Sequence, residues 1–135
     1  MEQVERFGVS MPPALLEQFD QAITDAGYAN RSEAIRDIVR DYLVQKRWEQ
    51  PDAQVVGTIT LVYDHHTHEL EDRLTDLQHD HHEAIICSTH VHLDAHNCLE
   101  VIAVRGQSAE VQRIAQHLLS TRGVKHGGLT ATASE

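Results

Sequence analysis

The chain has 135 residues, a hydrophobic fraction of 41% and a formal net charge of −10 at pH 7. These values permit one domain or two small ones, and they argue against nucleic-acid binding through bulk positive charge. No apolar run approaches the about 18 residues that a membrane span needs, and the N-terminus has no signal-peptide pattern. We therefore expect a cytoplasmic protein whose two cysteines are thiols rather than a disulfide.

The distribution of histidine divides the chain. All eleven histidines fall between His65 and His126, and none lies in the first fifty residues. The break in composition coincides with Gln50-Pro51-Asp52. It predicts two domains, covering residues 1–50 and 51–135.

The first domain has the pattern of one strand followed by two helices. Residues 6–11 carry apolar side chains at every second position, which predicts a short, half-buried strand. Pro12-Pro13 suits the first turn of a helix, and Gly27 ends that helix. Asn30-Arg31-Ser32-Glu33 resembles a capping box and predicts the start of a second helix.

A strand with no partner in its own domain pairs most readily with the same strand of a second copy. The expected product is a ribbon-helix-helix dimer, whose two-stranded ribbon enters the DNA major groove. Arg6 and Ser10 would then face base edges, while Gly8 offers no side chain for readout. Three polar residues lie where a helix N-terminus could clamp a phosphate: Asn30, Arg31 and Ser32. The alternative is a helical hairpin used only for dimerisation, with Arg6 as a solvated charge.

The second domain has the pattern βαββαβ. We expect, in chain order, a strand over 55–63, a helix over 68–82, a hairpin with its turn at 94–97, a helix over 108–121 and a short strand from 124. This order is the split βαβ, or ferredoxin-like (ACT-like), sandwich. The predicted fold class is therefore α+β, with an N-terminal ribbon-helix-helix domain and a C-terminal ferredoxin-like domain.

His90 and His92 lie two residues apart on the first hairpin strand, so their side chains project to the same face. Across the turn, Cys98 begins the second strand close to both imidazoles. Two nitrogens and one sulfur suit a late first-row transition metal better than calcium or magnesium. The alternative is a polar strand pair with a buried thiol. Cys87 has the opposite strand parity, so we expect it in the core.

A three-donor set needs a fourth ligand, and the candidates are the histidines at the end of the first helix of this domain. At 100° per residue, His79 lies about 180° from the apolar stripe, so as a ligand it would reach a neighbouring subunit. His81 falls on the stripe, where it is either a half-buried packing residue or a ligand. The other histidines are expected to be solvated or are not placed: His65, His66, His68, His82, His96, His117 and His126.

Over nearly its whole length the chain resembles the nickel-responsive ribbon-helix-helix transcriptional repressors. The motifs are residues 30–37, the His79 cluster, His90-Val91-His92, Cys98-Leu99-Glu100 and residues 123–127. The resemblance implies a homotetramer, in which two DNA-binding dimers flank a central tetramer of metal-binding domains. It also implies one square-planar nickel ion per subunit, held by His79 of another chain together with His90, His92 and Cys98.

The resemblance further implies a second cation, such as potassium, bound by Glu33 and Asp37. From the residues alone, two acids at i and i+4 repel each other, which fits either a cation site or relief by Arg36 and Arg40. The chain departs from the family's usual pattern at Gly8, where members often carry threonine or another side chain.

These features predict a metal-activated repressor that binds operator DNA sequence-specifically. The alternatives are a nickel or zinc buffering protein and a repressor that responds to another transition metal, since tetrahedral geometry would favour zinc and copper binds such donors tightly. A metalloenzyme is the least favoured class. Four protein donors leave no easy open position, and no general base is placed beside them.

Overall fold

The computed structural model describes residues 2–67 and 69–134. Contacts divide the chain into two compact units, the first ending at Asp41 and the second starting at Tyr42. The division falls within helix α2 (Arg31–Trp48), whose last turns therefore belong to the second unit. The domain boundary at residue 50 stays a prediction. In the described part of the chain, no helix has the length and apolar character needed to cross a membrane.

The first unit contains α1 (Pro13–Asp25) and the start of α2, and the expected end signals are confirmed. Gly27 has φ +91°, and its N–H donates to the Thr24 carbonyl at 3.0 Å. The Tyr28 N–H donates to the Ile23 carbonyl at 3.0 Å, which completes a Schellman end to α1. At the start of α2, the side-chain oxygen of Asn30 accepts from the Glu33 N–H at 2.9 Å.

Residues 2–12 lie outside every helix and strand of the single chain. Their apolar side chains are solvent-exposed, including Phe7 at 72% and Val9 at 64%. A strand is defined by its hydrogen-bonded neighbour, and the expected neighbour of this segment is the same segment of a second copy. The predicted strand is therefore a property of the dimer and stays a prediction.

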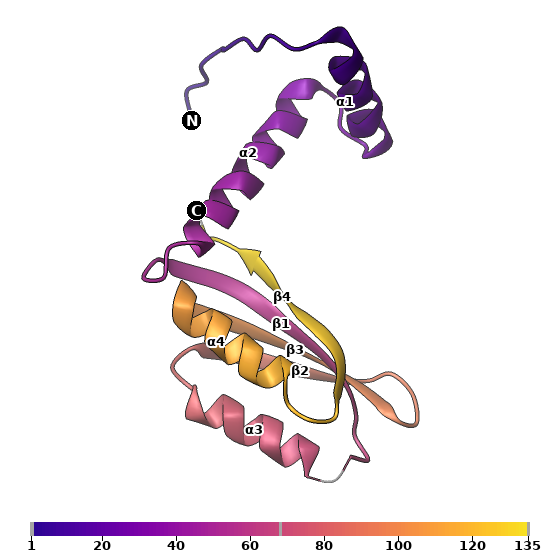
Figure 1. The fold of residues 1–135 in the computed structure, drawn as a ribbon, viewed down its shortest axis with the longest axis vertical. Helices are drawn as coiled ribbons and strands as arrows, with labels where there is room; N and C mark the ends of the chain where they lie inside the picture. Colours follow the sequence, from indigo (N-terminus) through magenta and orange to yellow (C-terminus); the bar gives the residue numbers. More distant parts are fainter. Residues whose placement is uncertain (1, 68, 135) are drawn as a thin grey trace. The chain divides into compact units, whose positions relative to one another are not determined.

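The second unit is a four-stranded antiparallel sheet in the order β2-β3-β1-β4, with two helices packed against one face (Figure 1). Its elements are β1 (Gln54–Asp64), α3 (Leu70–Asp80), β2 (Ile85–His92), β3 (Asn97–Gln107), α4 (Ser108–Leu119) and β4 (Val124–Thr132). The order and pairing confirm the ferredoxin-like βαββαβ fold.

Buried side chains alternate with more accessible ones along the two central strands, β1 and β3, and the buried ones form the core. Every second residue of β1, including Ile59 and Leu61, is buried against the helices. Leu74 of α3 and Ile114 of α4 bury the matching apolar stripes. Gly57 lies beneath the indole of Trp48, where a Cβ would come within 3.0 Å of the ring. The end of α2 thus packs on the sheet because β1 has no side chain there.

The predicted helix over 68–82 was too long at its C-terminal end. The helix ends at Asp80, because the chain then turns and the His81 carbonyl accepts from the N–H groups of Ala84 and Ile85. His81 is half-buried, as expected for a packing residue. His68, the expected first residue, lies outside the described residues. The second predicted helix, over 108–121, similarly ends earlier, at Leu119.

The expectation that Cys87 is a core residue was wrong. Cys87 has the predicted parity, since it pairs with Ala103 on the face opposite the helices. That face has no covering layer in the described part of the chain, so Cys87 is exposed, as is Val91 at 41%. Strand parity predicts the side of the sheet but not whether that side is covered.

Candidate metal centre

The hairpin of β2 and β3 brings the three predicted donors together. His92 pairs with Cys98, and His90 pairs with Glu100, so all of them face the helices. The Cys98 sulfur lies 3.5 Å from Nδ1 of His92, and the imidazole centroids of His90 and His92 are 5.5 Å apart. Cys98 is fully buried, while both histidines reach solvent. A buried sulfur with two solvent-accessible imidazoles beside it forms a site that a soft or borderline metal ion can reach from solvent and bind.

His90 is surrounded by polar side chains from β1, α3 and β3. The Tyr63 hydroxyl lies 3.3 Å from Nε2 of His90, and Glu71 places a carboxylate oxygen 3.8 Å from the same nitrogen. At the other ring nitrogen, a Glu100 oxygen lies 3.8 Å from Nδ1. The Gln78 amide donates to Glu100 at 3.0 Å. Together these contacts orient the imidazole of His90.

This supporting set was not predicted from the sequence. Glu100 is only 7% exposed, in a row of β3 that is otherwise apolar apart from Cys98. A carboxylate two residues from the predicted ligand, on the same strand face, was the signal that could have found it. Glu71, His90 and Cys98 also form a three-donor group whose ligand atoms lie within 4.8 Å of one another.

The position of His65 also differs from the one predicted. Expected to be solvated, it is half-buried, with Nδ1 3.3 Å from the Cys98 sulfur and its ring 5.4 Å from the ring of His92. The position is set by the backbone, because the His65 N–H donates to the His96 carbonyl at 3.0 Å. His65, His92 and Cys98 form a further group of donors within 4.8 Å.

The centre has an acidic environment. Burial is the main cause that raises the pKa of the Cys98 thiol, and nearby carboxylates add to it: Glu71, Asp64, Glu100 and Asp94. Burial also raises the pKa of Glu100. Negative charge beside the sulfur attracts a cation, and binding of that cation must displace the thiol proton.

His79 lies in the last turn of α3, is exposed, and belongs to neither donor group within the chain. That placement is what the helical spacing predicts for a residue that points away from its own sheet. Among the other described histidines, His66 donates from Nε2 to the Ala95 carbonyl oxygen at 3.0 Å. Four more are exposed, namely His82, His96, His117 and His126, while His81 is half-buried.

The predicted DNA-contacting residues lie in the first unit. Arg6, Gly8 and Ser10 are exposed, as is Ser32 in the first turn of α2. Arg31 is held by both oxygens of Asp20, at 2.8 and 2.7 Å. The helix N-terminus thus presents a fixed guanidinium, while the side chain of Asn30 is used in capping.

The residues of the predicted second cation site have partners within the unit. Asp37 accepts from the Tyr28 hydroxyl at 2.8 Å and pairs with Arg40 at 3.3 Å. These contacts stabilise the negative charge of the Asp37 carboxylate in the single chain. Glu33 contributes its backbone N–H to the cap of α2.

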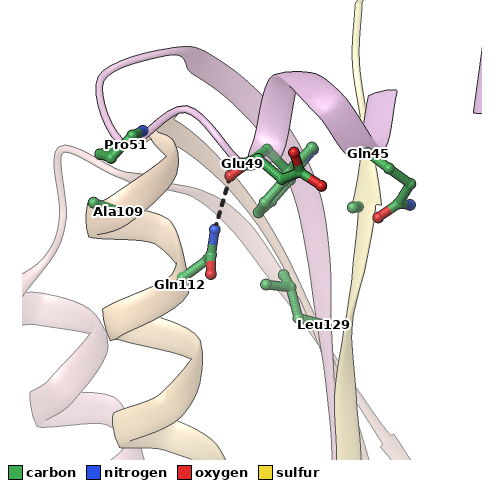
Figure 2. A pocket seen from close by; sticks show the side chains of 8 residues that line it. Gln45, Glu49, Pro51, Ala109, Gln112 and Leu129 are labelled. Atoms are coloured by element: carbon green, nitrogen blue, oxygen red, sulfur yellow. Dashed lines mark hydrogen bonds between the residues drawn. The ribbon is translucent and has the colours of Figure 1, made fainter. Parts of the chain in front are cut away.

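The second unit also has an open groove of about 530 Å³ at the end of α2, away from the histidines (Figure 2). Gln112 of α4 donates to the Trp48 carbonyl at 3.1 Å, and the Trp48 indole donates to the Thr132 carbonyl at 2.9 Å. The groove is lined by Gln45, Trp48, Glu49, Pro51, Ala109, Gln112, Leu129 and Ala131. Its lining contains none of the predicted metal ligands.

The fold and the donor groups define a class: a helical pair of the DNA-binding kind joined to a metal-binding ferredoxin-like sheet. The model of the NikR C-terminal nickel-binding domain matches residues 56–132, and that of the ribbon-helix-helix proteins of the copG family matches residues 5–46. Proteins named as nickel-responsive regulators in Solibacter usitatus and Geobacter sulfurreducens are each 55% identical over 99% of this chain and 96% of the relative. One from Caldanaerobacter subterraneus is 52% identical over 99% of this chain and 87% of its own length. The chain belongs to the family of nickel-responsive regulators.

Proposed function

We propose that the protein is a transcriptional repressor that binds operator DNA when it is loaded with nickel. The observation that carries this proposal is the arrangement of the donors. His90, His92 and Cys98 converge on one hairpin face, while the exposed His79 belongs to no donor group among the described residues of its own chain.

The donor chemistry fits nickel. Three imidazoles and one thiolate are borderline and soft ligands, which suit a late transition metal in a tetragonal or planar arrangement. His90, His92 and Cys98 of one subunit and His79 of another would hold the ion, one per subunit. When bound, the ion supplies coordination bonds that link two polypeptides.

Coordination by His79 of another subunit would change the quaternary arrangement. His79 lies in the last turn of α3, so its recruitment by a neighbour would order that end of the helix. Ligand binding then biases a quaternary arrangement in which both ribbons engage one operator. Charge contributes little, because Cys98 loses a proton when a divalent ion binds, which leaves a local change of about +1. Geometry must therefore carry the coupling.

The first unit would make the contacts with DNA. Arg6, Gly8 and Ser10 would face base edges from the paired ribbon. The start of α2 would hold a phosphate with its free backbone N–H groups, and Arg31, oriented by Asp20, supplies positive charge beside it. The assembly expected for this arrangement is a homotetramer built as a dimer of dimers. A second cation such as potassium at Glu33 and Asp37 would have to displace the Tyr28 hydroxyl and Arg40 from Asp37.

The test is selection of duplex DNA from a random library with the full-length protein, with and without nickel. We expect one enriched sequence only in the nickel-loaded sample, and the enrichment should disappear for His79→Ala. The control is His117→Ala, an exposed histidine on α4 that should behave as the unaltered protein. Equal enrichment with and without nickel would refute the proposal. Several metal ions per chain with no enriched DNA would instead identify a buffering protein.

A further inference from the structure

Asn97 directly precedes Cys98, and each of its polar groups has a partner in the structure. Its backbone N–H donates to Oδ1 of Asp94 at 2.8 Å, and its backbone carbonyl accepts from the Leu93 N–H at 2.9 Å. Its side-chain amide donates to Oδ2 of Asp94 at 3.0 Å, and its side-chain oxygen accepts from Nζ of Lys125 at 2.6 Å. A fully satisfied polar network of this kind makes the residue rigid.

We propose that Asn97 and Asp94 are positioning residues of the metal centre, which close the β2–β3 turn and thereby hold Cys98 opposite His92. This inference rests on the proposed function, in which Cys98 and His92 bind the ion. Neither positioning residue is a ligand, and both act through the backbone of the turn.

Asp94 determines the shape of the turn. The connection between β2 and β3 spans residues 93–96 and belongs to no helix or strand. Oδ1 of Asp94 accepts from the His96 N–H at 2.8 Å, which is an Asx turn, and the same oxygen accepts from the Asn97 N–H. One carboxylate thus binds two consecutive backbone N–H groups and the side chain of Asn97.

The two ligands next to the turn form the last pair of the β2–β3 ladder. His92 and Cys98 are register partners, and Nδ1 of His92 lies 3.5 Å from the Cys98 sulfur. Beyond this pair the ladder has no further rungs, so the closed turn is what keeps the strand ends from separating. The distance between the two ligand atoms therefore depends on the hydrogen bonds of the turn.

Lys125 connects the turn to a distant part of the sheet. It lies near the start of β4, and β1 separates β4 from β3 in the strand order. The bond from Lys125 to Asn97 therefore reaches across β1, and it fixes the start of β3 from the side opposite β2. Asn97 is thus held both by the turn and by the other edge of the sheet.

Positioning of this kind increases metal affinity. Ligands that are already in place lose less conformational entropy when they bind an ion. Groups that only orient ligands typically contribute about 10- to 100-fold to metal affinity. We expect the pair of Asn97 and Asp94 to contribute within this range.

The experiment exchanges the donor and the acceptor of the pair in the full-length protein. Asn97→Asp places a second carboxylate against Asp94 and should weaken nickel binding by about 10- to 100-fold, measured by competition with a chromophoric chelator. Combining Asn97→Asp with Asp94→Asn again sets one amide against one carboxylate. The amide oxygen at position 94 still accepts from the backbone N–H groups, so the double variant should recover most of the nickel affinity.

A control variant and a second readout separate positioning from general stability. Thr121→Val removes a hydrogen bond of 2.7 Å from a side chain to the His117 carbonyl in the same unit, and it should bind nickel as the unaltered protein does. The melting temperature of each variant establishes that it is folded at the temperature of the titration.

Two results would overturn the inference. One is unchanged nickel affinity in folded Asn97→Asp, even with a lower melting temperature, and the other is a double variant that binds nickel no better than Asn97→Asp. The absence of thiolate-to-nickel absorption in the unaltered protein is a separate outcome. It would overturn the ligand set of the proposed function, and this inference with it.

Discussion

The two units of the chain bury their apolar side chains to very different extents. In the second unit, Ile59, Leu61 and Ile102 are completely buried. In the described part of the first unit, only Ile23 and Ala34 are buried, while Ile38 remains 52% exposed. A helical pair of about 40 residues has too little core to fold alone, and a second copy is the partner that we predict for it. The difference indicates that the sheet unit is a scaffold in its own right, and it supports the prediction that a second copy completes the helical unit.

The largest effect on the sheet unit is expected at its core. Ile59→Ala should lower the free energy of unfolding by about 2–5 kcal/mol, because the site is enclosed and a cavity would remain. Ile59→Val is the graded control, with an expected loss of about 0.5–1.5 kcal/mol. Urea unfolding measures both. Equal stability of the two variants would mean that this core is not close-packed.

The helical unit should respond to a change on its exposed apolar surface. Ile38→Glu should weaken DNA binding by about 100-fold or more, because an unpaired carboxylate buried in an interface costs several kcal/mol. Binding to the selected duplex, measured by fluorescence anisotropy, reports the loss. Gln18→Glu adds the same charge at an exposed polar site of α1 and should change affinity little. Full DNA binding by Ile38→Glu would place the dimer contact elsewhere.

A smaller loss of stability is expected where α2 meets the sheet. A Cβ at Gly57 would lie 2.8 Å from the Thr130 carbonyl oxygen and 3.0 Å from the Trp48 ring. Gly57→Ala should therefore cost about 1–3 kcal/mol. Gly128→Ala is the matched control, since nothing lies within 4 Å of its Cβ position. Thermal unfolding followed by Trp48 fluorescence separates the two, and identical melting temperatures would contradict the packing described.

The smallest effect concerns the ion pair between Asp20 and Arg31. The hydrogen bond from Arg31 lowers the pKa of Asp20 below its ordinary value. A lowered pKa contributes stability above the unfolded value of about 3.9, and that contribution is lost as the pH falls through the folded value. Asp20→Asn should thus cause a slight loss of stability at neutral pH and none in strong acid. Asp25→Asn, on the same helix, is the control in a melting-temperature profile against pH. An equal loss at every pH would exclude the ion pair as its cause.

Much of the sheet unit follows from the sequence, because period-2 alternation determines which residues share a face. The parity of His90, His92 and Cys98 is confirmed by the β2–β3 register. The contact between His65 and Cys98 was not predictable in the same way, since it depends on a loop conformation set by the long-range bond to the His96 carbonyl. The exposure of Cys87 depends on whether a layer covers the second face of the sheet, which alternation does not encode. The assignment of ligand roles remains a prediction.

The most direct test of the account is complementation between two inactive variants. His79→Ala keeps the hairpin donors, and Cys98→Ala keeps His79, so neither variant alone should show the planar nickel spectrum. After subunit exchange in an equal mixture, we predict that about a quarter of the sites regain the thiolate-to-nickel absorption, because each restored site takes the hairpin of one variant and His79 of the other. No recovery after exchange has been verified by native mass spectrometry would contradict a site shared between subunits.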